Sequence, residues 1–117
     1  MDLAELVRSL LGGDLLAARQ QVADAKRNNT DWQRLPQPGD LDDRSLIIAA
    51  ALAEMLAARF GAKPPAWTKA IGGLRELLVL DPGLENMPRS FAHAKNAGPE
   101  PFRRRNLVAL PDFLDVA

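Results

Sequence analysis

The sequence predicts an all-α protein, in which an N-terminal αα-hairpin and a long central helix are followed by a C-terminal half of short helices and proline turns. Apolar residues recur at helical spacing near the N-terminus, and the segment Arg44–Phe60 is apolar nearly all round. The nine prolines lie outside these segments. Because 117 residues is a common length for one domain, we expect residues 1–117 to form a single helical domain.

Two short helices joined by a tight turn are predicted at the N-terminus. The first follows Asp2, a natural N-cap, and has one apolar stripe formed by Leu3, Leu6, Val7, Leu10 and Leu11. Gly12–Gly13 interrupts this pattern, and Asp14 can cap a second helix over Leu15–Arg27. One face of the second helix is also apolar, with Leu15, Ala18, Val22 and Ala25. The short turn between them makes the pair an αα-hairpin.

A connector between Thr30 and Asp43 leads from the hairpin to the central helix. Two prolines and a glycine in its middle forbid regular structure there. Trp32 and Leu35 are too apolar for a free linker, so we expect them to pack back onto the helices. The connector is therefore expected to be ordered.

The central helix is predicted over Arg44–Phe60, with Asp42 or Asp43 as its N-cap. Apolar and alanine side chains surround its axis, so we expect neighbouring segments to cover it on several sides. Glu54 and Arg59 are expected to mark a narrow face toward water. This segment is the predicted core helix of the protein.

The C-terminal half is predicted to alternate turns with short helices. One helix is expected over Pro65–Ile71 and another over Arg89–Asn96, each with a proline at or just before its start. The apolar run Leu74–Leu80 fits either a helix or a buried strand, and we favour the helix. Further helical turns are expected at Arg103–Arg105 and at Phe113–Leu114. A small β-hairpin is the main alternative to this arrangement.

The composition narrows the possible classes of function. The 15 Lys and Arg residues balance the 15 Asp and Glu residues, which argues against a surface built throughout for phosphate. Since there is no cysteine and a single histidine, we expect no metal site and no cofactor. No apolar run is long enough to span a membrane, and Met1–Leu6 lacks the features of a secretory signal, so we expect a soluble, cytoplasmic protein.

Candidate catalytic residues are few. His93 is the one side chain whose ordinary pKa lies near neutrality, and its neighbours on the predicted helix include no carboxylate to orient it. Helix capping explains Asp42–Asp43, and Asp112 with Asp115, better than a glycosidase or magnesium site does. We therefore expect no catalytic residues and no enzyme activity. A small enzyme built on His93 or on one of these carboxylate pairs is a third, less favoured hypothesis.

The candidates for contact with a partner are Arg103, Arg104, Arg105, Trp32 and Trp67. Guanidinium groups suit bidentate contact with carboxylates or phosphates. Because successive helical residues point about 100° apart, at most two of the arginines can share a face, and an internal structural role has equal weight. Each tryptophan likewise has two interpretations, as part of the core or as an aromatic contact for a partner.

Two binding functions remain open from the residues alone. The first is a non-enzymatic domain that binds another protein. The second is a nucleic-acid-binding accessory domain that uses Arg103–Arg105 on phosphate. We favour the protein partner because the total charge is neutral.

Three landmarks of the sequence are distinctive. The first combines Gly13–Arg19 with Asp31–Trp32, the second is Pro64–Thr68, and the third is Pro101–Leu107. Together they resemble a group of small, uncharacterised bacterial proteins, and the resemblance spans most of the chain. Members of that group are similar to antitoxin-like proteins encoded beside nucleotidyltransferase-type proteins. The resemblance implies a binder that restrains a neighbouring enzyme, and it supplies no catalytic residues. The segment between Gly72 and Met87 departs from the group's pattern.

Overall fold

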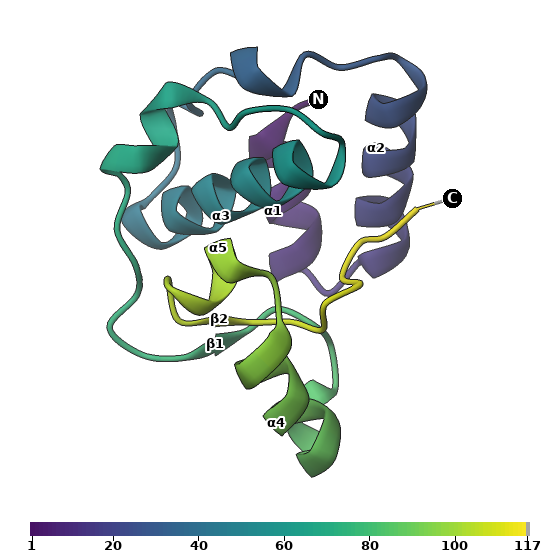
Figure 1. The fold of residues 1–117 in the computed structure, drawn as a ribbon, viewed down its shortest axis with the longest axis vertical. Helices are drawn as coiled ribbons and strands as arrows, with labels where there is room; N and C mark the ends of the chain where they lie inside the picture. Colours follow the sequence, from purple (N-terminus) through teal and green to yellow (C-terminus); the bar gives the residue numbers. More distant parts are fainter. Residues whose placement is uncertain (117) are drawn as a thin grey trace.

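The computed structural model describes residues 1–116 and shows a mostly helical fold (Figure 1). The elements are, in chain order, α1 (Leu3–Leu11), α2 (Leu15–Arg27), η1 (Trp32–Arg34), α3 (Asp43–Arg59), η2 (Ala66–Ala70), β1 (Leu78–Val79), η3 (Leu84–Asn86), α4 (Pro88–Ala97), α5 (Glu100–Arg103) and β2 (Leu107–Val108). The elements labelled η are short 3₁₀ helices. The all-α prediction is confirmed, with two strands of two residues each added to it.

The two N-terminal helices begin where aspartates supply their caps. The side chains of Asp2 and Asp14 each accept a hydrogen bond from the backbone N–H three residues further on, at 3.1 and 3.0 Å. α2 has the bounds that the sequence predicts, and α1 packs against both α2 and α3. One residue of the predicted stripe of α1, Leu11, is 43% exposed because it lies where the helix ends.

α3 is the buried centre of the fold. Asp42, one of the two predicted N-caps, caps it by accepting a hydrogen bond from the backbone N–H of Ser45 at 2.7 Å. Every residue from Ile48 to Ala57 is buried, because α1, η1, η2 and α5 pack around the helix. The expectation that Glu54 faces water is wrong, since this residue is 7% exposed. Across residues 1–116, no helix has both the length and the apolar character needed to cross a bilayer.

The connector packs back onto the helices through its apolar residues, as predicted. Trp32 and Leu35 are 5% and 6% exposed. The Trp32 ring stacks on Phe60, just beyond α3, with 5.0 Å between the ring centroids. The indole Nε1 of Trp67, in η2, donates a hydrogen bond to the backbone oxygen of Leu35 at 2.8 Å. These contacts tie the connector to the end of α3 and to η2.

The helix favoured over Leu74–Leu80 is wrong, because this segment contains a bend and the short strand β1. β1 pairs with β2 in parallel, with Leu78 opposite Leu107. Two backbone N–H groups of the segment donate to carbonyls in or beside β2, at 2.9 and 3.0 Å. The β-hairpin alternative does not describe this pair, because parallel strands need a crossover, supplied here by η3, α4 and α5.

α4 projects at one end of the long axis of the molecule, over a small core of its own (Figure 1). The buried members of this core are Leu84, Ala94 and Val108, with Val79, Phe91 and Leu110 packed around them. α4 begins at Pro88, the proline predicted to open a helix here. It ends at Gly98, where a Cβ would lie 2.5 Å from the backbone oxygen of Ala109, so this close approach requires glycine.

Candidate functional site

The three arginines of the predicted contact run lie at the end of α5 and in the turn after it, in three different environments. Arg105 is 3% exposed and points into the protein. Its Nη1 and Nη2 donate to the two carboxylate oxygens of Glu54 at 3.0 and 2.8 Å, a bidentate ion pair. This pair explains why Glu54 can lie in the middle of α3 away from water.

Arg105 also donates hydrogen bonds to backbone oxygens from two other segments. These are the carbonyls of Pro101, Thr68 and Ile71, at 3.1, 3.1 and 3.3 Å. Burial lowers the pKa of the Arg105 guanidinium, but arginine starts so high that the group stays charged at neutral pH. Arg105 therefore holds α3, η2 and α5 together, and its side chain is not part of the molecular surface.

Arg104 lies between the buried ion pair and the solvent. Its side chain is 50% exposed, its Nη2 bonds to Glu54, and its Nε lies 3.9 Å from the carboxylate of Glu100 one helical turn earlier. Burial and then the charge of Arg105 lower the pKa of Arg104, which stays protonated at neutral pH for the same reason as Arg105. About half of its guanidinium-bearing side chain is thus open to a partner.

Arg103 is exposed, and its orientation is set by one backbone contact. Its Nε donates a hydrogen bond to the backbone oxygen of Gly98 at 2.8 Å. Arg59, at the end of α3, is held in the same way, because its two Nη atoms donate to the backbone oxygens of Phe113 and Pro111 at 2.6 and 3.2 Å. Among residues 1–116, neither arginine has a carboxylate within ion-pair distance.

A groove of about 510 Å³ opens beside α5, between the end of α3 and the end of α4. We call it the proline groove. Its apolar lining residues are Met55, Ala58, Ala97, Pro99, Pro101 and Pro111. Arg59 and Glu100 are its two charged lining residues. The groove therefore places an apolar surface directly beside the exposed side of α5.

The surroundings of the proline groove carry an excess of positive charge. The arginines on its wall and on or just after α5 are Arg59, Arg103, Arg104 and Arg105, against the carboxylates Glu54 and Glu100. With the exposed Asp112 beside Pro111 counted as well, four positive and three negative charges leave an excess of one. The chain as a whole is neutral, so the positive charge is local to this surface.

The two tryptophans proposed as partner contacts do not join this surface. Trp32 is buried against Phe60, so its ring is not accessible. Trp67 is half-buried in η2 and is not among the residues that line the groove. The structure thus leaves Arg103, Arg104 and part of Trp67 at the surface, with Arg103 as the last residue of α5 and Arg104 in the turn directly after it.

The predicted weak candidates for catalysis are dispersed. His93 is exposed on α4, and Asp42 is occupied as the cap of α3. The hydrogen bonds from the backbone and side chain of Ser45 lower the pKa of Asp42, which keeps it a charged acceptor. Asp112 and Asp115 are exposed near the C-terminus. Within residues 1–116, no three His, Asp or Glu side chains cluster as a metal site would require.

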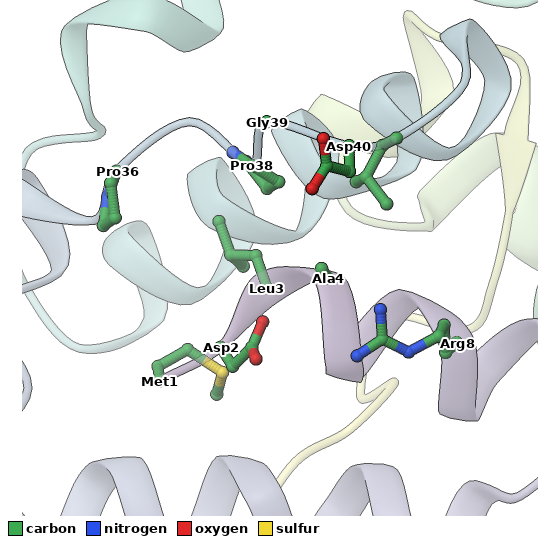
Figure 2. Close-up of a pocket in the computed structure, with 10 residues that line it drawn as sticks. Met1, Asp2, Leu3, Ala4, Arg8, Pro36, Pro38, Gly39 and Asp40 are labelled. Carbon is green, nitrogen blue, oxygen red and sulfur yellow. The ribbon is translucent and has the colours of Figure 1, made fainter.

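A second cavity, of about 380 Å³, lies between α1 and the connector (Figure 2). Asp2 and Arg8 come from the α1 side of this cavity and Asp40 from the connector, while Leu3 and Pro38 supply apolar surface. Asp2 already serves as the cap of α1. The carboxylates of Asp2 and Asp40 thus come from opposite walls, and Arg8 supplies one guanidinium. Within residues 1–116, no histidine and no hydroxyl side chain lines this cavity, so it lacks the usual groups for acid–base or nucleophilic catalysis.

Sequence reasoning did not find the proline groove or the role of Glu54. One signal for the ion pair was Glu54 itself, a carboxylate in the apolar middle of α3. A carboxylate that is buried there needs a cation beside it, and the run Arg103–Arg105 contains candidates. The clustering of prolines around α5 was the other signal. Comparisons with protein families, with curated proteins and with solved structures gave no match to this chain.

Proposed function

We propose that this protein is a non-enzymatic interaction domain that binds another protein through the exposed side of α5. The observation that carries the proposal is the local excess of guanidinium groups beside an apolar groove, on a chain that is neutral overall. Protein interfaces are enriched in arginine and methionine and combine an apolar centre with polar contacts around it. Arg103 and Arg104 are the proposed contact residues, and Arg105 supports them from inside.

The resemblance described above suggests the kind of partner. A binder that restrains an enzyme encoded beside it needs a shaped surface and no catalytic groups of its own. In this proposal the protein acts as an antitoxin-like partner of a neighbouring enzyme. The dispersal of His93 and the aspartate pairs is in keeping with a function that does not depend on acid–base chemistry.

Binding to nucleic acid is less well supported. Of the three arginines that this alternative assigns to phosphate, Arg105 is committed to Glu54 and Arg104 is partly neutralised by Glu54 and Glu100. One free guanidinium and one shared one are a small site for a polyanion, whose binding usually rests on several phosphate contacts. By contrast, a single guanidinium can bind a carboxylate of a protein partner through two parallel hydrogen bonds.

Affinity purification from an extract of the source organism tests the proposal. The full chain is immobilised, and retained proteins are quantified for the wild type, for Arg103→Ala and for the matched control Arg89→Ala, an exposed arginine on α4. We expect one protein to be retained in stoichiometric amount by the wild type and the control. Arg103→Ala should lower the affinity of the chain for this retained protein about tenfold, which is the effect expected when a well-placed interface arginine is lost. Recovery of no stoichiometric protein by the wild type would contradict the proposal.

A further inference from the structure

We infer that the proline groove receives an apolar side chain from an acidic segment of the protein partner, whose carboxylate pairs with Arg103. This inference rests on the proposed function and specifies the chemistry of the partner. It combines two observations. The groove has a mostly apolar lining, and the guanidiniums of Arg59 and Arg103 bond to backbone oxygens but to no carboxylate within residues 1–116.

The lining of the groove favours an apolar side chain as its occupant. Three prolines form much of the wall, and their fixed backbone angles mean that little flexibility is lost when the groove is filled. Met55, which lines the groove from α3, is an adaptable apolar side chain that can adjust to different shapes. The volume of about 510 Å³ is open toward solvent, which suits a side chain that enters from another protein.

Arg103 is held near the groove with most of its guanidinium available to a carboxylate. Its Nε is used by the backbone oxygen of Gly98, next to the groove residues Ala97 and Pro99. Among residues 1–116, no acceptor is bonded to its Nη1 or Nη2. Because its Nε is already fixed, Arg103 can form a charge-assisted contact with a carboxylate through Nη1 and Nη2 with little loss of side-chain freedom.

Arg59 on the groove wall and Arg103 near it favour an acidic segment over a basic one, because neither guanidinium has a carboxylate partner among residues 1–116. Arg59 donates only to neutral backbone oxygens, so its charge is not compensated by any carboxylate in residues 1–116. Glu100 is the acidic group on the wall, and Arg104 lies 3.9 Å from it. A nucleic acid is a poorer fit, because none of the aromatic residues within 1–116 lines the groove for a base to stack on.

A labelled model peptide provides the direct test. The probe is a short fluorescein-labelled peptide in which a single leucine is flanked by glutamates, and its binding to the full chain is followed by fluorescence anisotropy. Two control peptides carry alanine for the leucine or glutamine for the glutamates. We expect the leucine–glutamate peptide to bind the wild type at least about tenfold more tightly than either control peptide, with an affinity that falls as salt rises. Equal binding of the three peptides would overturn the inference.

A substitution that fills the groove locates the site. Ala58 lines the groove and is exposed, so Ala58→Gln should occupy the groove without disturbing the core. The matched control is Ala92→Gln, on the exposed side of α4. We expect Ala58→Gln to weaken the peptide about tenfold and Ala92→Gln to leave it unchanged, with thermal unfolding by circular dichroism showing that both variants fold. Equal peptide affinity in the two variants would overturn the assignment to the groove.

Ala58→Gln also separates this inference from the proposed function. If the wild type retains a stoichiometric partner and Ala58→Gln retains it equally well, the groove assignment fails while the proposed function stands. If the wild type retains no partner, the proposed function fails. A labelled single-stranded oligonucleotide serves as a further probe, and tighter binding of the oligonucleotide than of the leucine–glutamate peptide would overturn the acidic-segment inference in favour of nucleic acid.

Discussion

The region around α3 and the region around α4 are held together by cores of very different size. The main core draws buried apolar residues from α1, α2, η1, α3, α5 and β2, whereas the core under α4 has Leu84, Ala94 and Val108 as its buried members. Since buried apolar area is the main source of stability, α4 should open at a much lower free energy than α3. The proline groove lies at the junction, because Met55 comes from α3 and Ala97 from α4.

The ion pair between Glu54 and Arg105 makes the large core depend on one charged contact, and the small core under α4 has no such pair among residues 1–116. In Glu54→Ala the Arg105 guanidinium stays buried without its carboxylate. Breaking a buried ion pair from one side typically costs about 3–5 kcal/mol, the largest loss that we expect. Urea unfolding of the full chain measures it.

Two further variants control for this effect. Glu100→Ala removes an exposed carboxylate near the same arginines and should change the free energy of unfolding by less than about 1 kcal/mol. The double variant Glu54→Leu with Arg105→Met replaces both charges and should recover part of the stability lost in Glu54→Ala. A loss in Glu54→Ala no larger than that in Glu100→Ala would show that the pair is not important for stability.

Matched leucine substitutions compare the two cores directly. Leu52 in α3 and Leu84 in η3 are both fully buried, and replacing a buried leucine with alanine costs about 2–5 kcal/mol where the surroundings cannot collapse. We expect Leu52→Ala to lower the global free energy of unfolding. Leu84→Ala should act first on α4, by lowering amide protection over Pro88–Ala97 while α1 stays protected.

Hydrogen exchange measured by mass spectrometry distinguishes these outcomes. If Leu84→Ala lowered protection in α1 as much as in α4, the two regions would unfold as one unit. The contrast between the two cores would then have no consequence for dynamics.

The smallest expected effect concerns the cap of α3 and is a dependence on pH. Hydrogen bonds from Ser45 lower the pKa of Asp42 in the folded protein. The stabilisation from charged Asp42 is therefore complete above the ordinary pKa of aspartate and is lost as the pH falls through the lowered folded-state pKa. Asp42→Asn keeps a capping side chain and should remove this part of the acid sensitivity.

Unfolding midpoints measured between neutral and acidic pH test this expectation. The control is Asp40→Asn, since Asp40 is an exposed aspartate of the same connector that caps no helix. If Asp42→Asn and the wild type lost stability in parallel on acidification, the capping contact would not be the source of the pH dependence.

Much of the fold could be predicted because its signals are local. The caps Asp2, Asp14 and Asp42, the bounds of α2 and the start of α4 all depend on residues within one or two helical turns. The burial of Trp32 was also predictable, since an indole side chain in a polar connector seeks apolar cover. Of the candidate site, sequence reasoning identified Arg103 and Arg104 as a charged cluster but not the groove beside them.

The sequence was enough to place α1 to α4 and the run of arginines, because helix caps, proline and apolar periodicity act over a few neighbouring residues. Tertiary structure alone decided that Leu78–Val79 is a strand and that Arg105 is buried while Arg103 is exposed. The physical reason is that a strand needs a partner backbone and a buried charge needs a counter-charge. Here β2 and Glu54 supply them from distant parts of the chain, where no local pattern records the pairing.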